Sequence, residues 1–210
     1  MFQVFKNVKE NITDILFPKI CIACGEEGRY ICEKCSLFLS EVPNITKTGG
    51  LEELVSIWEY EGVIKRILLK IKQEGVFDVV NELVEKAFEI RETYIPEDTK
   101  ITFVPMFKKK ERRRGFNQAE LIAKKIGEIT GKEVLTLLEK AKDTPSQDEL
   151  SKEKRIVNVR DSFSLINKPP SSILLIDDFW VSGATMRECC RILKISGVKK
   201  IFGFTLARIV

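Results

Sequence analysis

Apolar and polar residues along this chain fall into blocks that predict strands and helices in alternation. Short apolar runs predict strands at Leu54–Tyr60, Ile101–Met106, Ile173–Ile176 and Lys200–Leu206. Apolar residues at helical spacing predict helices at Val63–Lys72, Phe77–Tyr94, Ala119–Thr130 and Thr185–Ile195. Gly197 follows the last helix as a helix stop, and the repeated strand–helix–strand order favours a parallel sheet. We therefore expect an α/β fold.

The N-terminal part of the chain has a different pattern. Apolar residues at helical spacing precede Pro18, and they are Phe5, Val8, Ile12, Ile15 and Leu16. We expect this helix to pack on its own protein rather than on a membrane surface. Residues 36–50 contain Pro43 and a Thr-Gly-Gly turn, which predicts a linker. The expected domains are 1–46, with the helix and a cysteine motif, and 47–210, the α/β domain.

The cysteine motif consists of Cys21, Cys24, Cys32 and Cys35, with the spacing C-x2-C-x7-C-x2-C. Two C-x-x-C turns can present four thiolates to one tetrahedral zinc ion, at about 2.3 Å for each Zn–S bond. In a protein of the cytoplasm this spacing favours a structural zinc over disulfides. Redox-active or metal-free thiols are the alternative. We call residues 21–35 the cysteine knuckle.

Composition places the chain among globular proteins. Its 210 residues suit one substantial domain with a small appendage, and 44% are hydrophobic, enough for a packed core. The formal net charge is only +4, but residues 100–160 hold 16 lysines and arginines against 9 acidic residues, which favours an anionic ligand or nucleic acid. The absence of histidine excludes histidine ligands and bases. No stretch predicts a signal peptide or a membrane span, so we expect a cytoplasmic protein.

The run Ile173–Thr185, ILLIDDFWVSGAT, combines several chemical features in a short space. Asp177 and Asp178 directly follow the predicted strand Ile173–Ile176, and strand ends in α/β sheets border the ligand crevice. Ionised carboxylates only accept hydrogen bonds, so two in sequence suit the vicinal hydroxyls of a ribose. Gly183 lets the backbone approach a ligand, and the helix N-terminus that follows favours a phosphate. The run predicts a ribose 5-phosphate site; a buried strand with an acidic loop and a helix cap is the alternative.

These residues resemble the phosphoribosyl pyrophosphate (PRPP) motif of the type I phosphoribosyltransferases. The resemblance implies that Asp177 and Asp178 are the catalytic pair that holds the ribose hydroxyls. It assigns PRPP binding through the 5′-phosphate to Val181, Ser182, Gly183, Ala184 and Thr185. It also implies the type I fold, a parallel sheet flanked by helices, and Mg²⁺ bound with PRPP. Phe179 and Trp180 replace the usual smaller residues, and we expect them to narrow the pocket or stack on a base.

The segment Phe107–Gln118, FKKKERRRGFNQ, carries the densest positive charge, with six basic residues and one acidic residue. We expect a loop between the strand Ile101–Met106 and the next helix. In the type I family the corresponding region contacts pyrophosphate, and guanidinium groups bind phosphate oxygens in pairs. The expected contacts from this segment are Lys108, Arg112, Arg113 and Arg114. A nucleic-acid surface and a solvated loop without function are the alternatives.

Longer stretches narrow the resemblance to the ComF family, also called GntX or competence protein F. It rests on the cysteine knuckle, VPMFKKKERRRGFNQAELIA, DTPSQ…LSKEKRIVNVRDSF, IDDFWVSGAT and the final TLAR. Lys72 in LLKIKQEG also matches a family position and joins the expected pyrophosphate or nucleic-acid contacts. Phe107 stands where the family usually has a second proline. The resemblance implies assistance in the import of single-stranded DNA during natural competence, beside a helicase-like partner.

Three functions remain open at this point. The protein can be a PRPP-binding member of the ComF family, or an active Mg²⁺-dependent phosphoribosyltransferase that acts on a nucleobase or an amine. It can also be a non-catalytic nucleic-acid-binding module whose knuckle docks a partner. In that case Phe107, Phe116 and Trp180 are candidates for stacking on bases.

Overall fold

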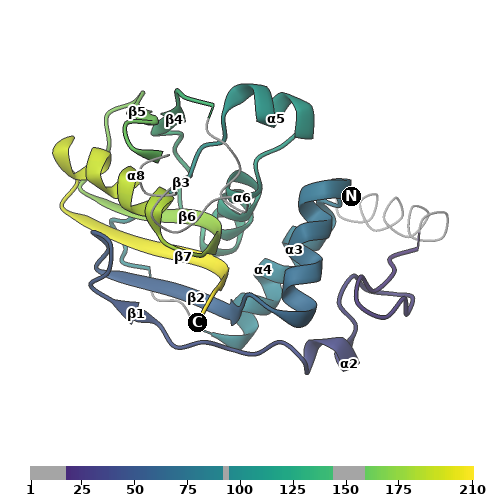
Figure 1. Cartoon of the computed structure of the whole chain (residues 1–210). Coiled ribbons are helices and arrows are strands. Elements are labelled where there is room, and N and C mark those ends of the chain that lie inside the picture. Colours follow the sequence, from purple (N-terminus) through teal and green to yellow (C-terminus); the bar gives the residue numbers. More distant parts are fainter. Residues whose placement is uncertain (1–17, 92–94, 144–158) are drawn as a thin grey trace, which may run out of the picture.

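The computed structural model describes residues 18–91, 95–143 and 159–210 (Figure 1). The predicted N-terminal helix and most of the DTPSQ segment lie outside these residues. Among the described residues the elements are α2 (Glu33–Ser36), β1 (Ile45–Thr46), β2 (Glu53–Glu59), α3 (Gly62–Glu74), α4 (Asp78–Ile90), β3 (Lys100–Phe103), α5 (Lys108–Arg114), α6 (Gln118–Thr130), β4 (Leu138–Lys140), β5 (Phe163–Leu165), β6 (Ser172–Trp180), α8 (Ala184–Ile195) and β7 (Lys200–Arg208).

Helix α3 illustrates why these segments are helical. Its buried residues recur at helical spacing and form one apolar face: Val63, Ile64, Ile67, Leu68 and Ile71. The helix ends at Gly75, whose left-handed φ of 69° suits glycine, and the Gly75 N–H donates to Ile71 O. This end places Lys72 in the last turn of the helix.

The main sheet has five strands in the order β1-β2-β7-β6-β3. Strand β1 is antiparallel to β2, and the other four strands are parallel to one another. The first five residues of β6, Ser172–Ile176, are all buried, because the sheet is covered on both faces. Helices α4 and α6 pack on one face, and α8 lies on the other (Figure 1). The predicted α/β fold, with a parallel sheet flanked by helices, is confirmed.

The basic segment is a helix rather than the predicted loop. Helix α5 begins after Phe107, whose carbonyl accepts from the N–H groups of Lys110 and Glu111 at 2.8 and 3.0 Å. It ends at Gly115, which has a φ of 88° and donates to Glu111 O. The expectation of a loop was wrong because this short helix is held by its two ends, while no residue within it is buried.

A small antiparallel ribbon, β4 with β5, was not predicted from the sequence. Each strand has only three residues, too few for a periodic apolar signal. Helix α8 contacts β5, so the ribbon lies on the α8 side of the sheet. This position brings β4 to the carboxyl edge of the parallel strands, where Phe107 forms a bridge with Lys140.

The cysteine knuckle packs against the α/β part of the chain. The Glu82 carboxylate on α4 accepts from Tyr30 N at 3.1 Å and from Ile31 N at 2.8 Å. Ile31 itself is buried in the same apolar core as the sheet. The division at residues 46 and 47 therefore stays a prediction. Among the described helices, none is long and apolar enough to cross a membrane.

Candidate functional site

Strand β6 runs further than the sequence predicts and contains the acidic pair. Its pairing with β3 ends at Ile176, whereas its pairing with β7 continues to Trp180. Asp177 and Asp178 therefore lie within the strand, half-buried, beyond the end of β3. The expected strand end before the acids was wrong because β7 continues beside them and supplies backbone partners.

A cavity of about 190 Å³ lies at this edge of the sheet and brings distant segments together. Its charged lining residues are Lys72 from α3, Lys110 and Arg114 from α5, Lys140 from β4, and Asp177 and Asp178 from β6. The turn after β6 and the start of α8 add Val181, Gly183, Ala184 and Thr185. Most of the predicted ribose-phosphate residues thus border one cavity, together with Lys72 and Arg114.

Several other predicted contact residues lie outside this cavity in the described part of the chain. Arg112 and Arg113 are exposed on α5. Lys108 is also exposed, with its Nζ 3.6 Å from Glu139 Oε2. Ser182 is buried, and its hydroxyl accepts from Ala184 N at 3.4 Å. These side chains shape the turn or the outer surface of α5 and do not form the cavity wall.

Burial dominates the electrostatics of the acidic pair. It raises the pKa of Asp177 well above its ordinary value, and the neighbouring charge of Asp178 raises it further. Burial likewise raises the pKa of Asp178, although the positive charges of Lys72 and Arg114 act in the opposite direction. Each acid accepts a hydrogen bond from the backbone N–H of the next residue. Asp178 N donates to Asp177 Oδ1 at 3.0 Å, and Phe179 N donates to Asp178 Oδ1 at 2.9 Å. Burial therefore favours the neutral forms of the two acids, whereas donors and positive charges beside them favour the ionised forms.

Lys140 is a cavity residue that sequence reasoning missed. It reaches the cavity from β4, with its Nζ 5.5 Å from the ring centroid of Phe163. Burial lowers the pKa of Lys140, and the charge of Lys110 lowers it further, whereas Asp177 is among the groups that raise it. Its place just before the DTPSQ segment was the available signal in the sequence. Lys110, also missed as a contact, has its Nζ 3.2 Å from Asp143 Oδ1.

The aromatic residues after the acidic pair do not form an open base-stacking platform. Trp180 is only 9% exposed, and Phe179 stacks on Tyr60 with ring centroids 4.6 Å apart. Phe116 is also buried and contacts Phe77 edge to face. Both Phe179 and Trp180 border the cavity, so their positions fit the expected narrowing of the pocket. Trp180 and Phe116 are too buried to stack on a base.

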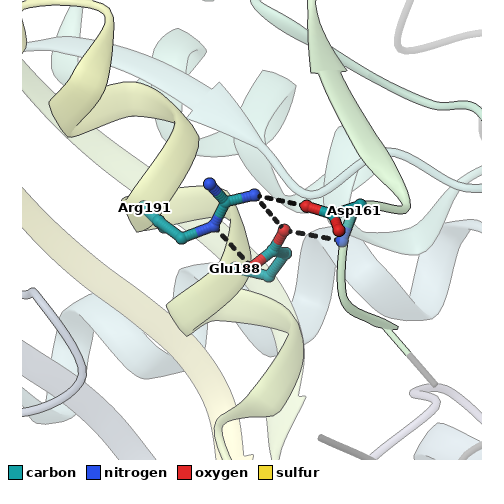
Figure 2. A network of polar contacts seen from close by, with 3 residues as sticks. All are labelled: Asp161, Glu188 and Arg191. Carbon is teal, nitrogen blue, oxygen red and sulfur yellow. Dashed lines mark hydrogen bonds and ion pairs between the residues drawn. The ribbon is translucent and has the colours of Figure 1, made fainter. Parts of the chain in front are cut away.

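A polar network fixes α8, the helix that begins just after the Gly183 turn. Figure 2 shows Arg191 between two carboxylates, with its Nη2 3.0 Å from Asp161 Oδ1 and 2.7 Å from Glu188 Oε1. Glu188 also accepts from Asp161 N at 2.9 Å. The bond from Arg191 lowers the pKa of Glu188, which keeps this buried carboxylate ionised. The network ties the segment before β5 to the helix.

The four knuckle cysteines form a second candidate site. Their Sγ atoms all lie within 4.8 Å of one another, and Cys24 Sγ and Cys32 Sγ are 3.6 Å apart. In a tetrahedral site with Zn–S bonds of about 2.3 Å, the sulfurs are about 3.8 Å apart. Cys32 N also donates to Cys21 Sγ at 3.5 Å, which suits a thiolate. The predicted cluster is confirmed, and its four thiols fit one metal ion such as zinc.

Comparison with known proteins finds relatives with names that refer to competence or DNA utilization. The chain is 28% identical to competence protein F of Haemophilus influenzae, over 91% of this chain and 85% of that protein. It is 24% identical to competence protein ComFC of Bacillus subtilis, over 90% of this chain and 78% of that protein. It is 23% identical to the DNA utilization protein YhgH of Escherichia coli K12, over 90% of each. No protein-family model matches the chain. The chain is thus similar to competence proteins across about nine tenths of its length, in agreement with the resemblance to the ComF family that its motifs indicate.

Proposed function

We propose that this protein binds PRPP with Mg²⁺ in the cavity at the carboxyl edge of its sheet, and that it acts in DNA uptake. One observation carries the proposal: the acidic pair, the glycine turn and four basic side chains border the same cavity. The role in DNA uptake rests on the relatives, which are named competence and DNA utilization proteins. The parallel sheet and the acidic pair at its carboxyl edge are compatible with a type I phosphoribosyltransferase fold.

The charges of the cavity favour a sugar phosphate. Without a ligand, Asp177 lies beside Asp178, and Lys140 is repelled by Lys110. The hydroxyls of a sugar phosphate can donate to the two carboxylates, and its phosphates can accept from the lysine and arginine side chains. Such a ligand relieves the repulsion within both groups of like charges.

The residues present also fit Mg²⁺. This ion prefers oxygen ligands, retains several waters and often binds through one or two carboxylates together with substrate phosphates. Asp177 and Asp178 supply such carboxylates beside the expected pyrophosphate position. Bound Mg²⁺ would neutralise phosphate charge, while Lys72, Lys110 and Arg114 hold the pyrophosphate oxygens. In an active transferase these same cations would stabilise the departing pyrophosphate.

The test is a thermal-shift titration with PRPP and Mg²⁺. We expect a saturable rise in the melting temperature of the wild-type protein, about 2–4 °C for each kcal/mol of ligand stabilisation. The double change Asp177→Asn and Asp178→Asn should abolish that rise, because amides donate as well as accept and carry no charge for Mg²⁺. An unchanged rise in the double variant, or none in the wild type, contradicts the proposal.

The stability of the free double variant serves as the control. A carboxyl whose pKa is raised in the folded state contributes stability at low pH, and this is lost as pH rises through the raised pKa. At a pH above the ordinary pKa of an aspartate, the raised pKa values of the pair therefore lower the stability of the free protein. We expect the free double variant to melt no lower than the wild type. Pyrophosphate release on addition of a nucleobase or an amine then separates transfer from binding alone.

Single-stranded DNA binding by α5 is a second candidate function. The helix sequence KKKERRR exposes Lys109, Arg112 and Arg113 outside the cavity, and its last turn is entirely basic. Such a surface contacts the phosphate backbone without reading sequence. Because these basic residues lie outside the cavity that contains the acidic pair, DNA binding by α5 can be tested separately from ligand binding in the cavity.

Changing Arg112→Gln and Arg113→Gln should weaken single-stranded DNA binding and flatten its salt dependence, by about 0.7 in the log–log slope for each lost phosphate contact. Fluorescence anisotropy over a salt series measures both. The Asp177→Asn, Asp178→Asn variant is the matched control, because it should bind the same oligonucleotide like the wild type. An arginine variant with the wild-type salt slope excludes α5 as the DNA surface.

A further inference from the structure

The indole of Trp180 borders the cavity and packs against Gly183 in the turn formed by residues 182–185, the proposed phosphate turn. A Cβ placed on Gly183 would overlap this ring, with Cε2 at 2.7 Å. Trp180 also contacts Gly49, where an added Cβ would lie 3.4 Å from Cη2. The ring is therefore enclosed between the turn after β6 and the Thr48–Leu51 turn, which the sequence assigned to a linker.

Arg187 completes this contact from the first turns of α8. Its guanidinium donates to Ser182 O, the carbonyl just before Gly183, and its Cζ lies 5.9 Å from the Trp180 ring centroid. Its aliphatic stem packs on Gly49, where an added Cβ would lie 2.5 Å from Cγ. Trp180 thus packs on Gly183, while Arg187 binds the carbonyl of Ser182 in the same turn.

We propose that Trp180, with Arg187, is a positioning residue that sets the 182–185 turn in its phosphate-binding shape before the ligand arrives. The proposal rests on the function proposed above, and adds the residue that makes the turn rigid. Gly183 has a left-handed φ of 69°, which glycine adopts as one of several conformations. A large ring packed on Gly183 excludes the other backbone conformations of this glycine. A turn that is already in its binding shape binds a phosphate more tightly than one that becomes ordered on binding.

The expected consequence is specific to the 5′-phosphate. The cations Lys72, Lys110 and Arg114 come from α3 and α5 and do not depend on the turn. Loss of the ring should therefore weaken binding of ribose 5-phosphate while leaving binding of inorganic pyrophosphate unchanged. A general structural role would weaken both ligands together.

The experiment compares Trp180→Val with Trp180→Phe by calorimetric titration of ribose 5-phosphate and of pyrophosphate. We expect Trp180→Val to weaken ribose 5-phosphate by about tenfold, or about 1.4 kcal/mol, with pyrophosphate affinity unchanged. Trp180→Phe keeps an aromatic ring on Gly183 and should recover most of the lost affinity. Equal ribose 5-phosphate affinity in the wild type and in Trp180→Val overturns the proposal, as does a parallel loss of both ligands.

Two further measurements cover a Trp180→Val variant that does not fold. Arg187→Met keeps the aliphatic stem on Gly49 but removes the bond to Ser182 O, and should show the same selective loss. The chain has two tryptophans, so Trp58→Phe leaves Trp180 as the single reporter. Because the proposed turn is rigid before binding, the anisotropy of the Trp180 emission should be the same with and without ribose 5-phosphate; a rise in anisotropy on binding, as the turn orders, overturns the positioning role. A wild-type protein that binds pyrophosphate but not ribose 5-phosphate or PRPP overturns the proposed function as well.

Discussion

Replacing Cys35 with serine is expected to remove the bound metal and to unfold the cysteine knuckle. Serine is a poor ligand for zinc, and a structural zinc site contributes about 10–16 kcal/mol of apparent binding free energy at neutral pH. The packing of Ile31 in the main core and the bonds to the Glu82 carboxylate remain, but α2 has only four residues and cannot hold the rest of the knuckle in place by itself. Metal content by mass spectrometry should fall from one ion per chain to none, and trypsin should cleave at Arg29 or Lys34.

Cys190→Ala is the matched control, because Cys190 is a buried thiol outside the cluster. It should keep one metal ion per chain and an intact knuckle. The same digest tests the proposed boundary between residues 46 and 47. A protected fragment beginning near that boundary supports two domains. General proteolysis instead shows that Ile31 and the bonds to Glu82 make the knuckle part of the main core. Full metal content in Cys35→Ser contradicts the four-cysteine site.

Gly183→Ala is expected to abolish ribose 5-phosphate binding and to destabilise the protein. The left-handed φ of 69° costs a non-glycine residue about 1–3 kcal/mol. Overlap of the new Cβ with Trp180 adds about 1–3 kcal/mol of overpacking. Either the turn or the ring must move, and a displacement of about 1 Å at a binding contact can cost about a hundredfold. Thermal unfolding and titration with ribose 5-phosphate measure the two effects.

Gly131→Ala separates the backbone cost from the steric cost. Gly131 has nearly the same φ, 68°, but an added Cβ there would meet nothing within 4 Å. It should lose stability through the backbone alone and bind ribose 5-phosphate like the wild type. If Gly183→Ala is no less stable than Gly131→Ala, the packing of Trp180 on the turn has little energetic weight.

The sequence by itself determined most of the secondary structure and the ingredients of the site. Hydrophobic periodicity is a local property, so the long helices and buried strands were found within a few residues of their observed ends. The cysteine spacing and the run IDDFWVSGAT likewise carry their chemistry within a short stretch. These local patterns were sufficient for the α/β fold, the cysteine cluster and the resemblance to competence proteins.

Only the tertiary structure decided which residues share the cavity. Lys140 reaches it on a strand too short to show a period, and Arg112 and Arg113 lie outside it although they adjoin Arg114 in sequence. The extension of β6 through the acidic pair depends on β7, and the burial of Trp180 depends on a turn more than 100 residues earlier in the chain. Such contacts depend on how distant segments pack against one another, and that packing leaves no local pattern in the sequence.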